Sequence, residues 1–290
     1  MKSPLQPRLL FLATALSLAS CQPVFADTPP RTLDSVIAGT QRNPAHKALD
    51  SVWHPKETFQ FFDLKPNQKV IEIWPKQGWY TEILAPYLSE GGRLITAVEP
   101  ANTPERTRRR SEFLNKLADD PDTFGEAAVV TFDPPNSDIR LVGGVDSVIS
   151  ILNVHTWLKE NTFDGALAAF YRALKSGGTL GIIEGRAAPG TPLEISKRTG
   201  YVDENFIIER AKAAGFVLKA KSEINANPAD TRDQPTGVPD LLSGTLTESA
   251  PDARTLSENS RVPDRTTLLF IKPVDAPIPV DVVRSIREGS

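Results

Sequence analysis

Between residues 70 and 271, short apolar runs alternate with segments of helical character, and this alternation leaves few folds open to the chain. The apolar runs are mostly continuous rather than alternating with polar residues, which indicates strands buried on both faces. Helices between successive buried strands favour a mostly parallel sheet with a layer of helices on either side, an α/β fold. The predicted strands are 70–73, 93–98, 127–132, 145–152, 179–184, 216–224 and 265–271.

Glycine pairs and prolines mark where the intervening helices and strands end. The predicted helices are 79–88, 105–117, 164–174 and 204–214. They are preceded by a polar lead-in and a helix over 27–60, with a break at His54-Pro55 and a helix start at 56–62. The last two strands are joined by a long loop, 225–264, and could close one sheet edge in antiparallel fashion. A loop of that length in a compact domain is either mobile or functional.

The 290 residues suit one large domain, which we place at 61–272 with an extended tail at 273–290. The net charge of −3 gives no support for nucleic-acid binding, which usually requires a basic face. The run from Arg106 to Arg110 is the one basic cluster, and we interpret it as a solvated helix face.

Residues 1–26 have the character of a bacterial secretory signal: basic residues precede an apolar stretch, 9–19, that is too short to span a bilayer. The phrase Leu-Ala-Ser-Cys, ending at Cys21, resembles the lipobox of lipoproteins, and cleavage after Ala26 is the alternative. We therefore expect an exported protein, periplasmic or anchored to the outer membrane, with any membrane contact made through a lipid on Cys21. Cys21 is the only cysteine and the three histidines are scattered, so we predict no disulfide and no metal site.

Polar side chains stand at the ends of five of the predicted strands. In open sheets of this kind, ligands bind beyond the carboxyl ends of the strands, near the point where the strand order reverses. The sequence therefore predicts a ligand site at that edge. The residues concerned are Glu72, Glu99, Asp133, Asn153 with His155, and Glu184.

Several phrases resemble the class I S-adenosylmethionine-dependent methyltransferases, in particular a group of predicted exported bacterial members. They span about residues 45–272 and read HPKETFQFF, EIWPKQGWYTEILAPYL, NVHTW, GGTLGIIEGRA, GYVDENF and AGFVLKAKSEINANPADTRD. The resemblance implies a Rossmann-like sheet, mostly parallel, of seven strands with helices on both faces. It also implies S-adenosylmethionine as cofactor and a transferase activity.

The resemblance suggests a role for each polar strand end. Glu72 matches the acid of the first motif and Gly78 its turn glycine, while Glu99 matches the acid that accepts hydrogen bonds from both ribose hydroxyls. Asp133 stands where the adenine is contacted, and Trp74 and Tyr80 are expected to form walls of the cofactor pocket. Asn153 and His155 follow the fourth strand, where the acceptor lies, and a neutral His155 could accept a proton during transfer.

The chain departs from the family pattern W-P-G-G-G-W-Y, because Lys76 and Gln77 replace two glycines. A side chain at either position costs little at negative φ, but at positive φ it strains the backbone by about 1 kcal/mol or more. Two functions stay open: an exported methyltransferase acting on an unknown small or envelope-associated acceptor, or a degenerate envelope protein with this fold that binds another small molecule or a partner protein. A dinucleotide-binding dehydrogenase is disfavoured because no G-x-G-x-x-G follows the first strand.

Overall fold

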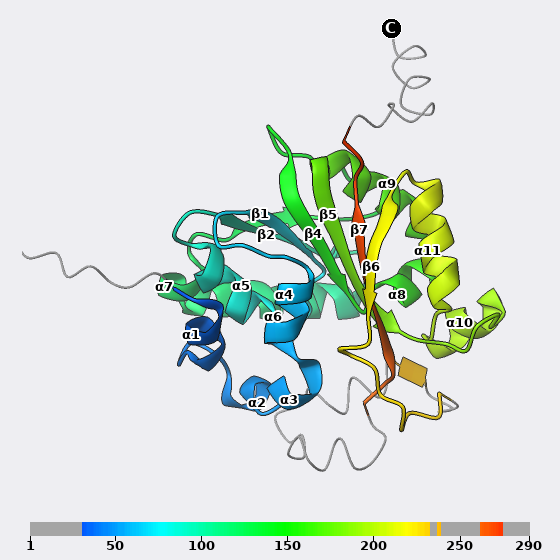
Figure 1. Cartoon of the computed structure of the whole chain (residues 1–290). Coiled ribbons are helices and arrows are strands. Elements are labelled where there is room, and N and C mark those ends of the chain that lie inside the picture. The colour runs from blue at the N-terminus through cyan, green and yellow to red at the C-terminus, as the bar shows by residue number, and fades with distance from the viewer. Residues whose placement is uncertain (1–30, 233–236, 239–261, 275–290) are drawn as a thin grey trace, which may run out of the picture. The chain divides into compact units, whose positions relative to one another are not determined.

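The structure, a computed structural model, describes residues 31–232, 237–238 and 262–274, which belong to one compact unit beginning at Arg31 (Figure 1). The predicted signal sequence, Cys21 and the tail beyond residue 274 lie outside the described residues, and so does most of the second half of the long loop.

A seven-stranded sheet forms the centre of the unit, with the strand order β3-β2-β1-β4-β5-β7-β6. β7 runs antiparallel to β5 and β6, and the other pairs are parallel, as predicted from the sequence. The strands are β1 (Lys69–Ile73), β2 (Arg93–Val98), β3 (Ala128–Thr131), β4 (Val145–Ile151), β5 (Leu174–Gly185), β6 (Val217–Ser222) and β7 (Arg265–Ile271). β5 begins five residues before the predicted Thr179, because Leu174 already pairs with Val145.

The strand order reverses at β1, which lies between β2 and β4. In register, Ile73 lies beside Ala97 of β2 and Ser150 of β4, so the ends of the three strands meet at one edge. The segments that follow these ends are the ones expected to hold a ligand.

Helices cover both faces of the sheet (Figure 1). On one face Trp157, Phe170 and Ile207 pack against the strands, and on the other Trp53, Phe59 and Leu84 do so. The helices are α1 (Leu33–Ala38), α2 (Pro44–Lys47), α3 (Asp50–Trp53), α4 (Pro55–Phe61), α5 (Thr81–Leu88), α6 (Pro104–Asp119), α7 (Pro121–Phe124), α8 (Val154–Lys159), α9 (Phe163–Ala173), α10 (Leu193–Thr199) and α11 (Glu204–Ala213). None of the helices among the described residues is both long enough and apolar enough to cross a membrane.

The N-terminal lead-in agrees with the prediction at the break before Pro55 and at the helix that starts there, α4, but its described part holds three short helices, α1 to α3, where the sequence suggested one. His54 adopts a left-handed conformation (φ 45°) before Pro55, which ends α3 and starts α4 in a new direction. These helices bury apolar side chains in the same cluster as α5, and Trp53 of α3 reaches the edge of the sheet described below.

Candidate cofactor and catalytic site

The turn after β1 holds three residues in the left-handed region: Trp74 (φ 46°), Lys76 (φ 54°) and Gly78 (φ 77°). A side chain at Gly78 would also be crowded, since its Cβ would lie 3.0 Å from the ring of Phe113 on α6. The backbone N–H of Trp74 donates to the carbonyl oxygen of Ala97, and its indole Nε1 donates to that of Phe132. The turn is thus held against the neighbouring strands in a conformation that favours glycine at all three positions, only one of which is glycine.

Lys76 stands where the pattern has a glycine. Because its φ is positive, its backbone is strained by the amount expected above for a side chain in that conformation. Its Nζ donates a hydrogen bond of 2.8 Å to the carbonyl oxygen of Leu152, just after β4. Burial lowers the pKa of this amine, although the carboxylates of Glu184 and Glu99 act in the opposite direction. Gln77, the second replacement, is exposed and has no positive φ, so it adds no backbone strain to the turn.

A cavity lies between this turn, the end of β4 and Trp53 of α3. It encloses about 70 Å³, on a scale where one water molecule needs about 10–15 Å³. Most of its wall is aromatic or aliphatic, and its lining residues are Trp53, Glu72, Ile73, Trp74, Pro75, Lys76, Gln77, Trp79, Tyr80, Ile151 and Leu152. The structure therefore brings Glu72, Trp74 and Tyr80 together in one wall, and it adds Trp53 from the N-terminal helices.

Glu72 is the acid in this wall, and it is 3% exposed. Burial raises the pKa of Glu72 to about 7. The hydroxyl of Thr81, which donates at 2.6 Å, and the charge of Lys116 lower this pKa, but by less than burial raises it. Among the described residues no lysine, arginine or histidine forms a salt bridge with Glu72. A carboxyl group buried among aromatic rings without a cation is chemically suited to a cationic ligand group.

Glu99, at the end of β2, is held by arginines of α6. Nε and Nη2 of Arg109 donate to the two carboxylate oxygens of Glu99 at 2.9 and 3.0 Å, and Nε of Arg106 lies 4.0 Å away. Arg110 donates to the backbone carbonyl of Glu99. A hollow beside Trp74 and Lys76 is lined by Glu99, Arg109 and Arg110.

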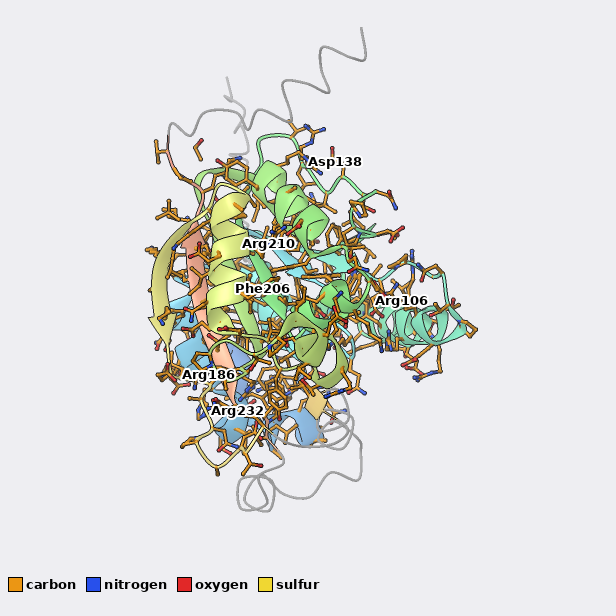
Figure 2. The ribbon with its side chains drawn as sticks, turned by 90° about the vertical axis from the view of Figure 1, so that its right-hand side faces the viewer. Arg106, Asp138, Arg186, Phe206, Arg210 and Arg232 are labelled. Atoms are coloured by element: carbon orange, nitrogen blue, oxygen red, sulfur yellow. The ribbon has the colours of Figure 1, made fainter. Side chains whose placement is uncertain are left out.

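The interpretation of 106–110 as a solvated helix face was therefore wrong for three of its arginines. Arg106 is only 8% exposed and its guanidinium lies 4.9 Å from the ring centre of Trp74; Figure 2 labels it on α6. The spacing 106, 109, 110 and 113 is that of one helix face, and Phe113 is buried. That spacing was the available signal that this face turns inward.

Three tryptophans of the cavity each carry a guanidinium on the ring: Arg42 lies over Trp79, Arg106 over Trp74 and Arg265 over Trp53. Arg42 and Arg106 also form ion pairs, with Asp50 and Glu160. Arg265 is 1% exposed and donates through Nη2 to the carbonyl of Val52, but its Nε and Nη1 have no partner among the described residues. Burial lowers its pKa to about 10.

His155, on α8, forms a buried dyad with Glu184 of β5. Its Nδ1 lies 2.9 Å from Oε1 of Glu184, whose oxygens also accept from the backbone N–H groups of His155 and Gly185. Because a carboxylate only accepts, Nδ1 is the donor and Nε2 is left with its lone pair. Nε2 has no hydrogen-bond partner among the described residues, and His155 is 8% exposed. Glu184, a strand end noted in the sequence, was not assigned this role there.

Asn153 and Asp133 do not line either hollow. The amide nitrogen of Asn153 donates to the carbonyl oxygen of Ile73 and ties the end of β4 to that of β1, while its buried Oδ1 has no partner among the described residues. Asp133 lies in the turn after β3, where Ser137 accepts a hydrogen bond from its backbone N–H. Within the described ranges no cluster of three or more His, Cys, Asp or Glu side chains could hold a metal ion.

Sequence reasoning missed Trp53 and Arg109. Trp53 comes from helices that share no phrase with the strand-end motifs, and only packing brings it to the cavity. Lys76 was noted as a departure, but its hydrogen bond to Leu152, 76 residues away, has no signal in the sequence.

No protein-family model and no curated protein sequence matches this chain. Solved structures do. An S-adenosylmethionine-dependent methyltransferase from Aquifex aeolicus is 13% identical, with a TM-score of 0.51, over 83% of this chain and 99% of that one. The [4+2]-cyclase SpnF is 15% identical, with a TM-score of 0.51, over 83% and 92%. The glycopeptide N-methyltransferase MtfA, solved with S-adenosyl-L-homocysteine, is 12% identical, with a TM-score of 0.49, over 77% and 90%.

The sequence identities are far below the level that would show a shared activity, so these similarities concern the arrangement of the backbone alone. The mixed sheet, the strand order and the antiparallel β7 are those of one known architecture. The chain has the fold of the class I S-adenosylmethionine-dependent methyltransferases.

Proposed function

We propose that the protein is an S-adenosylmethionine-dependent methyltransferase acting on a small or envelope-associated acceptor. One observation carries the proposal: at the edge where the strand order reverses, Glu72, Trp74 and Gly78 lie in or beside a cavity that adjoins the hollow of Glu99. A glycine turn, a buried acid and an acid after β2 are what a nucleoside cofactor with a cationic centre requires.

The residues present fit this cofactor. Gly78, with its positive φ and the ring of Phe113 where a Cβ would lie, lets the turn after β1 fold tightly beside the cavity. Glu72, buried without a cation, and the rings of Trp74 and Tyr80 would face the positively charged part of the cofactor. Glu99 would accept hydrogen bonds from the ribose hydroxyls. When bound, the cofactor supplies the reactive methyl group, and the protein supplies alignment and exclusion of water.

The dyad of His155 and Glu184 would serve the acceptor. The buried carboxylate of Glu184 fixes the tautomer in which Nε2 can take a proton from a nucleophilic oxygen or nitrogen. His155 follows Leu152 by three residues, and Leu152 lines the cavity and accepts the hydrogen bond of Lys76. Asn153 would hold the ends of β1 and β4 in register.

Export to the envelope is part of the proposal and rests on residues 1–26, with a lipid on Cys21 as the membrane contact. An exported enzyme would need S-adenosylmethionine to be supplied outside the cytoplasm, because this cofactor is a product of cytoplasmic metabolism. The acceptor would then be a molecule that meets the protein outside the cytoplasm.

A second function is favoured by two contacts in the same site. The amine of Lys76 crosses from the turn to the carbonyl of Leu152, and Arg109 occupies both oxygens of Glu99. A protein that keeps these contacts would bind another small molecule, or a partner protein, without transferring a methyl group.

Calorimetric titration of the whole chain with S-adenosylmethionine and S-adenosylhomocysteine distinguishes the two functions. We expect micromolar binding that Glu99→Ala abolishes and that Glu112→Ala, an exposed acid on α6, leaves unchanged. Glu72→Gln should weaken the binding of S-adenosylmethionine more than the binding of S-adenosylhomocysteine, because only the former carries a sulfonium. Absence of binding in the folded protein, in Lys76→Gly and in Arg109→Gln would overturn the methyltransferase proposal in favour of the second function.

A further inference from the structure

Arg109 donates to the same two carboxylate oxygens of Glu99 that a ligand would need. Glu99 is 7% exposed, and each of its carboxylate oxygens accepts a hydrogen bond from the planar guanidinium of Arg109. A vicinal diol, such as the two hydroxyls of a ribose, would likewise donate to both oxygens. Arg109 and a diol therefore cannot both bind Glu99 in this way.

Each partner of this contact has a second partner of opposite charge. Arg109 also donates through Nη1 to Glu105, one turn earlier on α6, whose side chain is 69% exposed. Glu99 also has Arg106 at 4.0 Å. Breaking a buried ion pair is costly when it leaves a charge without a partner. Here separation leaves Arg109 with Glu105 and Glu99 with Arg106, so that cost is largely absent.

Arg109 also has space to move into. It lines the hollow beside Glu99, and it lines a second hollow of about 170 Å³ on the outer side of the turn, together with Lys76, Gln77 and Phe113. Its side chain is 31% exposed, whereas that of Glu99 is 8% exposed. The arginine is thus the mobile member of the pair, and the carboxylate is the fixed one.

We propose that Arg109 sets the affinity and diol specificity of this site by competing with the ligand's hydroxyls for Glu99, and that it transfers to Glu105 when a ligand binds. The inference rests on the proposed function, since it takes the diol to be the ribose of an adenosine-type ligand. The apparent affinity is reduced by the fraction of molecules in which Arg109 covers Glu99.

Two substitutions test this with effects of opposite sign. Arg109→Gln frees Glu99 and should tighten binding of S-adenosylhomocysteine on the order of tenfold. Glu105→Gln removes the alternative partner of Arg109 and should weaken binding several-fold. The matched controls are Lys212→Gln and Glu209→Gln, an exposed i,i+3 pair on α11 that lines neither hollow and makes no contact with Glu99. Both controls should bind within about twofold of the wild type, because exposed pairs of this kind contribute little.

The ligand pair adenosine and 2′-deoxyadenosine locates the effect at the diol. The gain of Arg109→Gln should be present for adenosine and largely lost for 2′-deoxyadenosine, which offers Glu99 one hydroxyl instead of two. A thermal unfolding midpoint measured for each variant shows that the comparison is made between folded proteins.

The outcomes separate the two proposals. Binding that is tighter in Arg109→Gln and weaker in Glu105→Gln supports the inference, and so does binding that appears only in Arg109→Gln. Binding of equal strength in the wild type and Arg109→Gln overturns the inference and leaves the proposed function standing. If neither the wild type nor Arg109→Gln binds any of these ligands, both are overturned, because a freed Glu99 would then take no diol.

Discussion

The amine of Lys76 donates a hydrogen bond to the carbonyl oxygen of Leu152 at 2.8 Å, which joins the turn after β1 to the residue after β4. The turn residue that makes this contact has a φ of 54°, a conformation that glycine adopts freely and lysine does not. The contact therefore stabilises a strained residue, and both of its residues line the cavity beside Glu72.

Replacing Lys76 by glycine should change ligand binding more than stability. The substitution relieves about 1 kcal/mol of backbone strain but removes the hydrogen bond to Leu152, which is worth a similar amount, so the unfolding midpoint should move little. Removing the side chain enlarges the cavity, and we expect S-adenosylhomocysteine to bind more tightly in calorimetry. Asp63→Gly is the matched control, because Asp63 also has a positive φ (56°) but lines neither the cavity nor the hollow of Glu99. A complex that is no tighter in Lys76→Gly than in Asp63→Gly would contradict this account.

The buried Glu72 should make stability fall as pH rises. Its pKa is about 7 in the folded protein, against an ordinary value of 4.5. Between these values the folded state keeps a proton that the unfolded state releases, so the contribution is full below pH 4.5 and is lost as pH rises through 7. The free energy of unfolding should fall by about 3 kcal/mol across this window. In Glu72→Gln, measured by urea denaturation at several pH values, this part of the slope should be absent; parallel curves for the two proteins would show that Glu72 is not the titrating group.

The dyad of His155 and Glu184 predicts a pH-dependent loss of rate. If Nε2 of His155 takes a proton from the acceptor, Glu184→Gln should lower kcat on the order of 10²-fold and shift the acidic limb of the pH–rate profile, while cofactor affinity stays unchanged. Combining it with His155→Asn should cause little further loss, because the two side chains act as one unit. Additive losses, or an unshifted profile, would assign Glu184 a purely structural role.

The buried Arg265 and the half-buried Arg186 should respond oppositely to the same substitution. Arg265 has no carboxylate within ion-pair distance among the described residues, so Arg265→Met should leave the free energy of unfolding unchanged or raise it. Arg186 holds the fully buried Asp264 through Nε and Nη2, and Arg186→Met should cost about 2 to 3 kcal/mol even though Arg232 remains on that carboxylate. Figure 2 labels Arg186 and Arg232. Chemical denaturation of both variants measures the difference, and an equal loss in both would refute the distinction.

The alternation of buried strands and helices determined most of the fold from the sequence alone. Apolar runs follow from local composition, so all seven strands were placed, although the edge strands β3 and β6 are only half-buried. An antiparallel pairing of the last two strands was open from the long loop between them, and the structure has it. The resemblance to methyltransferases added the expected architecture of the sheet, which the solved structures support at the level of the fold. Short helices such as α8 and α10 were missed, because six or seven residues carry too little periodicity to be recognised.

The site was determined only in part, and the division has a physical reason. The sequence could name Glu72, Gly78 and Glu99, because residues at strand ends must meet at one edge once the sheet is parallel. It could not show that Arg109 covers Glu99, that Lys76 reaches Leu152, or that Trp53 closes the cavity. Those contacts depend on the direction in which a helix packs and on the conformation of single side chains, and only the tertiary structure decides both.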